Sequence, residues 1–322
     1  MASKNTNLHS AKKAKNDEFY TQLTDIEKEM KHYKDFFKGK VVYCNCDDAR
    51  ESNFFKYFSI YFEILGLKKL ITTGYKENGK GVVLIYEGDK NGNKIVEDSE
   101  IIVRELEGNG DFRSAECIEF LKESDVVVTN PPFSLFREYV AQLMEYGKKF
   151  LIIGDGNAVT YKEIFPYIKN NELWLGVEMK GCQQSVFIVP ATRIDTNTKE
   201  RMCDGKMRYS TIVNTASWFT NIPHNRRNIE LDLYKKYSAD EYPTYDNYDA
   251  INVNKVSEIP MDYNGVMGVP ISFLGKYCPT QFEILGIMSG AKGETFTNGN
   301  DGKAKFYVNG KGVYARILIR RR

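Results

Sequence analysis

Histidine is scarce in this chain of 322 residues, which contains three. Its six cysteines are scattered, and the close pair Cys44 and Cys46 is separated by a single residue. Structural and catalytic zinc sites draw on histidines and cysteines at characteristic short spacings, and none of those spacings occurs in this sequence. The sequence therefore offers no zinc motif, and we expect free thiols in a reducing compartment.

Long hydrophobic runs are also missing. No apolar stretch in the sequence is long enough to span a bilayer, and the first residues lack the apolar core of a signal peptide. Hydrophobic residues make up 42% of the chain and charged residues 27%, as in ordinary globular proteins. We therefore expect a cytoplasmic protein that does not contact a membrane.

A large excess of one charge is absent as well, because the net charge is only +2. Cations nevertheless gather at the two ends of the chain. They are Lys4, Lys12, Lys13 and Lys15 at the start, and Arg320, Arg321 and Arg322 at the end. Basic ends suit a phosphate backbone, but they also occur as plain solvated tails, so alone they are weak support for a polyanionic partner.

The most informative segment of the sequence is an apolar run that ends in Asn130, Pro131, Pro132 and Phe133. Residues 126–128 are all valine, which is typical of a short strand buried on both faces of a parallel sheet. The prolines cannot continue a ladder and hold the backbone extended. Open α/β sheets bind ligands at the carboxyl ends of their strands, although a simple proline turn is the alternative interpretation.

The residues around this segment predict an α/β fold. A strand over 39–44, a helix over 52–65 and a strand over 69–73 form a βαβ unit, which requires a parallel pair of strands. We expect a Rossmann-like, mostly parallel, doubly wound sheet. The other predicted helices cover 24–37, 114–122, 135–146 and 162–169, and the other predicted strands cover 150–153, 172–177, 185–189 and 217–220.

Two regions depart from this alternation. Residues 76–108 are strand-rich and predict a β insertion at the sheet edge. From residue 225 onwards the sequence is rich in Tyr, Asn, Asp and Gly, with an Asn309-Gly310 hairpin signal. We therefore predict a catalytic domain over 1–224 and a smaller target-recognition region over 225–322. A β-rich extension of the same core is the alternative.

The proline segment suits one particular reaction. The exocyclic amine of adenine is a poor nucleophile, and two hydrogen-bond acceptors would stabilise the positive charge that develops on its nitrogen during attack. Asn130 Oδ1 and the Pro131 carbonyl can supply them, Pro132 helps to hold the loop open, and Phe133 can stack on an extruded base. Attack on a sulfonium methyl then needs no metal and no covalent intermediate.

A sulfonium donor would need acids and a ring nearby. Asp47, Asp48 and Asp111 all fall on predicted loops at the carboxyl edge, where carboxylates suit ribose hydroxyls and positive charge. Phe112 beside Asp111 could cover the face of an adenosine. Each aspartate could instead be an N-cap or a turn residue.

Asn130-Pro131-Pro132-Phe133 resembles the catalytic motif of S-adenosylmethionine-dependent amino methyltransferases. Other blocks are similar to adenine-specific DNA methyltransferases of the EcoRI modification-methylase type, and the resemblance covers most of the chain. The matching blocks are residues 15–23, 41–48, 109–112, 125–133 and 245–286.

The resemblance implies roles for several residues. It implies that an arm over 15–23 folds back on the cofactor, with Phe19, Tyr20 and Thr21 as its wall. It also implies that Asp111 and Phe112 hold the cofactor adenine. The loop after the first strand, Asn45, Cys46, Asp47 and Asp48, departs from the superfamily pattern because it has no Gly-x-Gly.

The resemblance further implies contacts to DNA. A late-strand aromatic should touch the flipped base, and the candidates are Phe187, Trp218 and Phe219. The candidate phosphate-binding residues are Arg226, Arg227, Arg316 and Arg320. The last two are also consistent with the outward face of a strand.

The leading hypothesis is a site-specific DNA methyltransferase that transfers a methyl group from S-adenosylmethionine to N6 of a flipped adenine. Double-stranded DNA is then the partner, in a restriction-modification or epigenetic context, with a cognate restriction endonuclease as a candidate genetic partner and a monomer as the expected state. The rivals are an amino methyltransferase acting on RNA or on protein glutamine, and an inactive DNA-binding protein of the same fold.

Overall fold

The computed structural model describes residues 19–76, 78–180, 185–189, 194, 196, 198–288 and 306–322. Contacts divide the chain into two compact units, residues 1–156 with 178–222 and residues 157–177 with 223–322. Residues 157–177 fall within the catalytic domain that the sequence predicts, residues 1–224. They join the second unit because helix α7 (Phe165–Lys169) contacts strand β15 (Phe282–Met288).

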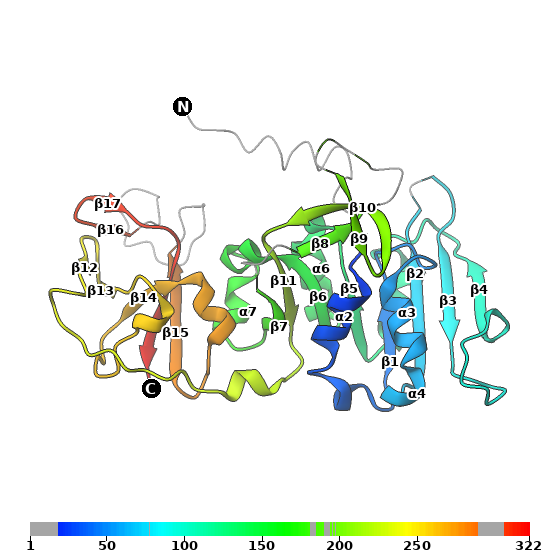
Figure 1. Ribbon diagram of the computed structural model, residues 1–322, viewed down its shortest axis with the longest axis horizontal. Helices are drawn as coiled ribbons and strands as arrows, with labels where there is room; N and C mark the ends of the chain where they lie inside the picture. The colour runs from blue at the N-terminus through cyan, green and yellow to red at the C-terminus, as the bar shows by residue number, and fades with distance from the viewer. Residues whose placement is uncertain are drawn as a thin grey trace. The chain divides into compact units, whose positions relative to one another are not determined.

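The large mixed sheet has the strand order β4-β3-β2-β1-β5-β6-β11-β7 (Figure 1), and all of its strands except β7 lie wholly in the first unit. Its strands are β1 (Val41–Cys44), β2 (Lys69–Gly74), β3 (Val82–Tyr86), β4 (Ile101–Glu105), β5 (Val126–Thr129), β6 (Lys149–Asp155), β7 (Trp174–Lys180) and β11 (Ala216–Thr220). The α/β class and the edge position of the β insertion agree with expectation.

The parallel part of this sheet is limited to its centre. Strands β2, β1, β5 and β6 pair in parallel, whereas β3 is antiparallel to β2, β4 to β3 and β11 to β6. The expectation of a mostly parallel sheet therefore needs correction. The connection from β2 to β3 covers only residues 75–81, too few for the crossover that a parallel pair requires, so the two strands form a hairpin.

The central strands place the candidate loops at one edge. Val42 pairs with Val126, and Val126 pairs with Lys149, so the carboxyl ends of β1, β5 and β6 end side by side. All four residues of β1 and of β5 are buried, as the apolar runs predicted. The loops that follow them, which begin at Asn45 and Asn130, are therefore neighbours.

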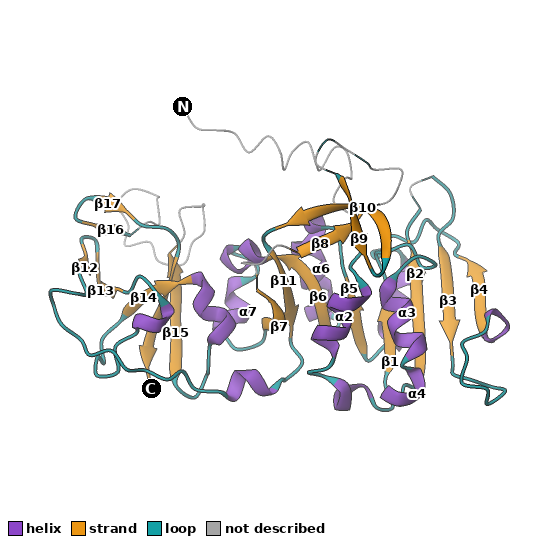
Figure 2. Cartoon of the chain, viewed as in Figure 1, coloured by secondary structure: helices purple, strands orange, loops and turns teal. Residues whose placement is uncertain are grey.

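Helices cover this sheet, and α2 and α3 lie together on one face of it (Figure 2). Two predicted helices are interrupted: 24–37 ends at Met30, and 52–65 breaks at Tyr61. The aromatic stripe of α3 lies in the core, as expected from its spacing. The helices are α2 (Leu23–Met30), η1 (Lys34–Phe37), α3 (Asn53–Ile60), α4 (Phe62–Leu65), η2 (Asp98–Glu100), α5 (Ala115–Glu123), η3 (Phe133–Leu135), α6 (Phe136–Glu145) and η4 (Gly156–Thr160).

A second, smaller sheet of the first unit was only partly expected. It is antiparallel with the order β8-β10-β9, where β8 is Ser185–Ile188, β9 is Lys199–Cys203 and β10 is Lys206–Val213. Strand β8 was predicted, but β9 and β10 were not. Their sequences are rich in long polar side chains, and pairing between the strands supplies the stability that their apolar content does not.

The second unit contains a five-stranded sheet with the order β12-β13-β14-β18-β15. Its other strands are β12 (Thr244–Tyr245), β13 (Tyr248–Asn252), β14 (Met267–Pro270) and β18 (Arg316–Arg321), and its short helices are η6 (Asn225–Asn228), η7 (Val256–Glu258) and η8 (Ile271–Lys276). The predicted hairpin is confirmed: Asn309 and Gly310 have φ of 50° and 72° between β16 (Tyr307–Val308) and β17 (Lys311–Gly312). Among the described residues, no helix has the length and hydropathy to cross a membrane.

Candidate active site

Asn130 lies directly after β5 and is only 5% exposed. Its Nδ2 donates a hydrogen bond of 2.6 Å to the Phe19 carbonyl. Its Oδ1 is buried and accepts no hydrogen bond from any residue that the structure describes. An unsatisfied buried acceptor costs about 1–3 kcal/mol. The orphaned oxygen is therefore a position at which a ligand N–H would be stabilised.

Aromatic rings stand beside this amide. Pro132 keeps an extended backbone (φ −54°, ψ 127°) and leads into η3, which begins at Phe133. The Phe133 ring meets the Phe19 ring edge-on, with centroids 6.4 Å apart, and Phe19 lies 6.1 Å from Phe187. Three rings from distant parts of the sequence therefore surround the Asn130 region.

The amino-terminal arm is held as an extra strand of the small sheet. The Tyr20 N–H donates to the Ile188 carbonyl and the Ile188 N–H donates to the Tyr20 carbonyl, both at 2.9 Å. Gln22 Nε2 adds a bond of 2.8 Å to the Val186 carbonyl. Phe19, Tyr20 and Thr21 thus lie together close to Asn130, while residues 15–18 of the predicted arm lie outside the described residues.

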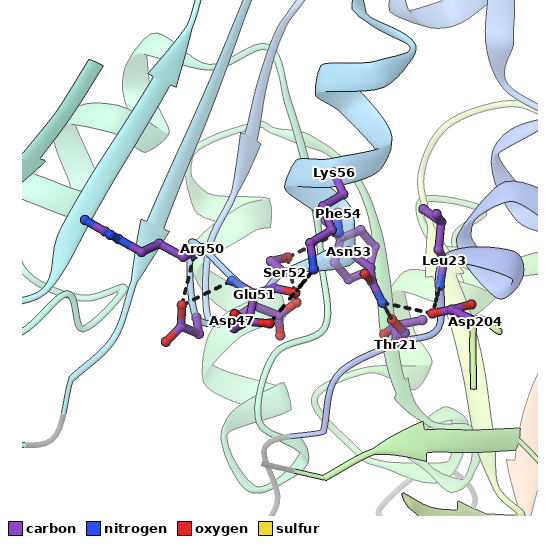
Figure 3. Close-up of polar contacts among 11 residues, drawn as sticks. Thr21, Leu23, Asp47, Arg50, Glu51, Ser52, Asn53, Phe54, Lys56 and Asp204 are labelled. Carbon is purple, nitrogen blue, oxygen red and sulfur yellow. Dashed lines mark hydrogen bonds and ion pairs between the residues drawn. The ribbon is translucent and has the colours of Figure 1, made fainter. Parts of the chain in front are cut away.

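Asp204, which is not among the residues predicted from the sequence, binds the next part of the arm. Its carboxylate accepts the Leu23 N–H at 3.0 Å and the Thr24 N–H at 3.4 Å, so it caps α2 from the turn between β9 and β10. Asn53 Nδ2 donates to Asp204 Oδ2 at 3.3 Å and to the Thr21 carbonyl at 2.8 Å (Figure 3). Asp204-Gly205 signals a turn, but no local signal indicates a partner 181 residues away.

The loop after β1 is immobilised without a Gly-x-Gly turn. Cys46 takes the left-handed conformation, with φ 72°, that glycine usually occupies. Asn45 is held on two sides, because the Thr129 hydroxyl donates to its carbonyl and the Tyr139 hydroxyl donates to its Oδ1. The buried Asp47 accepts a bond of 3.0 Å from Ser52 Oγ at the start of α3 (Figure 3).

Asp48 has the bonds of a turn residue. Its exposed carboxylate accepts the Arg50 N–H at 2.9 Å and the Glu51 N–H at 3.3 Å. These contacts match the alternative interpretation given for it, in which the aspartate stabilises the entry to a helix. Asp48 is therefore exposed in a turn, whereas Asp47 is buried.

The loop at 109–112 closes against the end of β2. Gly110 has φ 83°, and a Cβ there would lie 2.3 Å from the Gly74 carbonyl oxygen, so only glycine fits. Phe112 is buried edge-on to Tyr139, with ring centroids 5.0 Å apart. The Asp111 carboxylate forms an ion pair with Arg113, with 2.7 Å between Asp111 Oδ2 and Arg113 Nη2.

Tyr139 joins the two predicted cofactor loops, since it touches both Asn45 and Phe112. Burial, reinforced by nearby Cys46, raises the pKa of its hydroxyl well above the usual value. The hydroxyl is therefore protonated at neutral pH and remains a donor to the Asn45 side chain. No cluster of metal-ligating side chains occurs among the described residues.

Comparisons with known proteins identify the family. Residues 7–322 match the family model described as adenine-specific methyltransferase EcoRI. The chain is 51% identical to the type II methyltransferase M.EcoRI of Escherichia coli, an alignment that covers 99% of this chain and 98% of the relative. The chain belongs to this family. It is 40% identical to M.MpnI of Mycoplasma pneumoniae and 38% identical to M.MgeORF184P of Mycoplasma genitalium, each over 98% of both chains.

No solved structure matches this EcoRI-family methyltransferase. The family match and the relatives confirm the resemblance that the Asn130 motif indicates. The protein is an adenine-specific methyltransferase that requires a methyl donor. The residue roles rest on the geometry of this chain alone.

The three candidate base-contacting aromatics differ in their surroundings. Trp218 and Phe219 are both 0% exposed in β11. The Trp218 ring packs edge-on against Phe54, and the Phe219 ring lies 4.9 Å from Phe136. Both therefore belong to the core of the methyltransferase fold. Phe187 is also buried, but it contacts the Phe19 ring beside Asn130, so it is the best placed of the three.

The four candidate arginines all have partners within the second unit. Arg227 lies 3.7 Å over the Trp174 ring, and burial lowers its pKa to about 10. Arg226 reaches the Val177 carbonyl at 3.5 Å. In β18, Arg316 Nε donates to Asn252 at 3.2 Å, and Arg320 pairs with Glu283 at 2.9 Å. These contacts stabilise the unit, and the lysines predicted at the amino terminus lie outside the described residues.

Proposed function

We propose that this enzyme transfers a methyl group from S-adenosylmethionine to N6 of an adenine flipped out of double-stranded DNA. The observation that carries the proposal is the buried, unpartnered Oδ1 of Asn130, next to the rings of Phe19 and Phe133. An exocyclic amine needs such an acceptor, and an extruded base needs such a ring.

Asn130 is oriented before the base arrives. Because its Nδ2 donates to the Phe19 carbonyl, its Oδ1 must present the opposite side of the amide. That oxygen and the Pro131 carbonyl are the proposed acceptors for the two N6 hydrogens. They stabilise the positive charge that grows on the nitrogen as it forms its new bond, and they need no reorganisation at that moment.

Phe133 is the proposed stacking surface for the extruded adenine, with Phe187 as the second candidate. Extrusion costs a few kcal/mol of lost stacking and pairing, and stacking on the enzyme's rings offsets part of that cost. Phe19 connects the two rings and also supplies the carbonyl that orients Asn130. The arm thus couples base binding to the catalytic amide.

The residues at the carboxyl edge fit the donor. S-adenosylmethionine supplies an electrophilic methyl group on a sulfonium when bound. The buried carboxylate of Asp47 suits hydroxyls and positive charge, and the Phe112 ring suits the adenosine face. Asn45 and Cys46 line the same loop, and Tyr20 and Thr21 belong to the wall formed by the arm. Asp111 is proposed for the adenosine amine.

The setting of the reaction follows from the substrate. We propose a restriction-modification or epigenetic role in the cytoplasm, where cellular DNA and the donor are present, with the protein acting as a monomer. A cognate restriction endonuclease is the proposed genetic partner. Among the rivals, transfer to a protein glutamine does not fit an adenine-specific family, whereas RNA is the adenine-containing alternative.

The decisive experiment supplies radiolabelled S-adenosylmethionine together with duplex DNA, RNA and total protein. Label should enter the DNA alone, and sequencing with modified-base detection should place N6-methyladenine at a defined sequence. The Asn130→Ala variant is the control for contaminating activity. Label in RNA or protein with unlabelled DNA would overturn the substrate, and no donor binding by calorimetry would favour an inactive DNA-binding protein.

A further inference from the structure

Strands β9 and β10 form a two-stranded ribbon, residues 199–209, which has no role in the proposed chemistry. The ribbon continues from β8, which carries Phe187, and is drawn above the middle strands of the large sheet in Figure 1. Met202 pairs with Met207, Arg201 with Arg208, and Glu200 with Tyr209. Because side chains alternate along a strand, each pair projects to one face of the ribbon.

One face of the ribbon carries exposed apolar side chains together with Glu200. Met202, Met207 and Tyr209 are 65%, 60% and 41% exposed. Phe187 pairs with Thr211, and residues 211, 209 and 207 share a face, so this surface continues from the aromatic rings beside Asn130. Exposed apolar side chains gathered in this way mark a contact surface, and methionine adapts to irregular partners.

The other face carries like charges in direct opposition. Arg201 and Arg208 are cross-strand partners, an arrangement that destabilises a sheet unless an anion lies between them. Arg201 Nη1 donates to the Ser210 carbonyl at 2.8 Å and to Ser210 Oγ at 3.0 Å, bonds that leave its positive charge unneutralised. Lys199 and Lys206 share this face.

The acids of the ribbon do not neutralise these cations. Residues 199–209 contain four basic side chains and two acidic ones. Glu200 projects from the apolar face, and the carboxylate of Asp204 is occupied by the N–H groups of α2. The ribbon therefore carries net positive charge on the face opposite its exposed methionines.

We propose that the ribbon is a DNA-contacting surface that lies along the duplex beside the extruded nucleotide. Its cations, Lys199, Arg201, Lys206 and Arg208, pair with phosphates. Met202, Met207 and Tyr209 contact sugars and base edges, as apolar side chains of groove-binding proteins do. This inference rests on the proposed function and adds a contact surface in the same unit as the catalytic amide.

The test measures DNA binding by fluorescence anisotropy over a range of salt concentrations. Lys206→Gln with Arg208→Gln should reduce the slope of log affinity against log salt by about 2, which at about 0.1 M salt weakens binding on the order of 10- to 100-fold. Donor binding should be unchanged, and the melting temperature equal or higher, because repulsion between Arg201 and Arg208 is relieved.

Two controls keep the experiment specific. Lys34→Gln with Lys38→Gln removes two exposed cations at η1, before the amino end of β1, and should leave the slope unchanged. Arg208→Lys keeps the charge and should retain the wild-type slope. If Arg208→Lys lost as much affinity for DNA as Lys206→Gln with Arg208→Gln, the positive charge of the ribbon would not explain its DNA binding.

The apolar face is tested separately by Met202→Gln with Met207→Gln, which should weaken DNA binding without changing the salt slope. If both double variants bound DNA as the wild type does, the ribbon assignment would be overturned while the proposed function stood. If the wild type itself neither bound nor methylated DNA, the proposed function would fail instead.

Discussion

The two polar atoms of the Asn130 side chain differ in their hydrogen bonding. Its Nδ2 is satisfied by the Phe19 carbonyl, and its Oδ1 is buried without a partner among the described residues. Native proteins rarely leave such an acceptor unsatisfied, and a catalytic role is one explanation for it. In the proposed reaction, the preorganised oxygen would offset its cost in stability by binding the amine.

Replacing Asn130 tests this interpretation directly. Asn130→Ala should lower kcat by at least about 10²–10³-fold, as expected for the loss of a preorganised polar group, while DNA and donor affinities stay near wild type. Asn130→Asp should also be inactive, because a carboxylate cannot donate to the Phe19 carbonyl. Single-turnover methylation assays would measure the rate, and Asn91→Ala in the exposed β3–β4 connection is a matched control.

Asp111 presents an ambiguity that kinetics can resolve. Its carboxylate is held by Arg113, which also pairs with Glu138 at 3.0 Å. If Asp111 binds the donor, Asp111→Ala should raise the donor KM about 10- to 100-fold, in line with the loss of a charged hydrogen bond, and Arg113→Gln should raise it much less. Equal effects of the two changes, or an unchanged KM, would reassign this loop to structure.

At the scale of elements, three segments meet through Asp204 and Asn53: the arm before α2, the start of α3 and the β9–β10 turn (Figure 3). The arm in turn orients Asn130 through the Phe19 carbonyl. The chain of contacts runs from a turn that touches no reacting atom to the catalytic amide. Asp204 is therefore a positioning residue.

Removing the Asp204 carboxylate should loosen the arm. Asp204→Ala should lower stability by about 1 kcal/mol, the usual value of a helix cap, and should also raise the donor KM and lower kcat together. Asp204→Asn keeps an acceptor and should restore most of both parameters. Steady-state kinetics and thermal unfolding measured on the same samples would separate the two effects.

A matched control for this change is Asp89, which caps the turn between β3 and β4. Its carboxylate accepts the Gly92 N–H and the Lys94 N–H, each at 2.6 Å, and hydrogen bonds to the backbone lower its pKa. Asp89→Ala should reduce stability but leave the donor KM unchanged. A KM that rose equally in both variants would mean that Asp204 acts only through general stability.

At the scale of the whole molecule, contacts divide the chain into two units, and the five-stranded sheet belongs to the second of them. The residues proposed for catalysis all belong to the first unit. In the second unit, Arg227 stacks over Trp174 and Arg320 pairs with Glu283 across neighbouring strands. These arginines help to hold the second unit together, a role that differs from that of the ribbon cations.

This difference leads to a prediction for Arg227. Arg227→Ala should destabilise the protein by about 2 kcal/mol, since it removes a partly desolvated cation–π contact and the packing of the side-chain stem. The salt dependence of DNA binding should not change. Arg320→Gln should cost less than about 1 kcal/mol, as for an exposed pair. Calorimetric unfolding would measure the stability of the two variants, and salt titrations would measure their DNA binding. A shallower salt slope for Arg227→Ala would mean that Arg227 contacts a phosphate.

Local patterns in the sequence were enough to place the catalytic loop. Consecutive valines before Asn130 favour a buried strand that stops at Pro131, and Ser52, Ser114 and Gly66 set helix ends by their own side-chain and backbone chemistry. The Asn309-Gly310 turn was equally local. Such features depend on neighbours within a few residues, so the sequence by itself determined them.

Contacts between distant residues were decided only by the tertiary structure. Asp204 caps a helix 181 residues earlier, Phe187 approaches Phe19, and Trp218 is enclosed in the core. The direction of the edge strands of the large sheet and the formation of β9 and β10 also depend on the neighbouring strand with which each one pairs. No local preference encodes a partner that is distant in sequence, because long-range pairing is set by the packing of the whole chain.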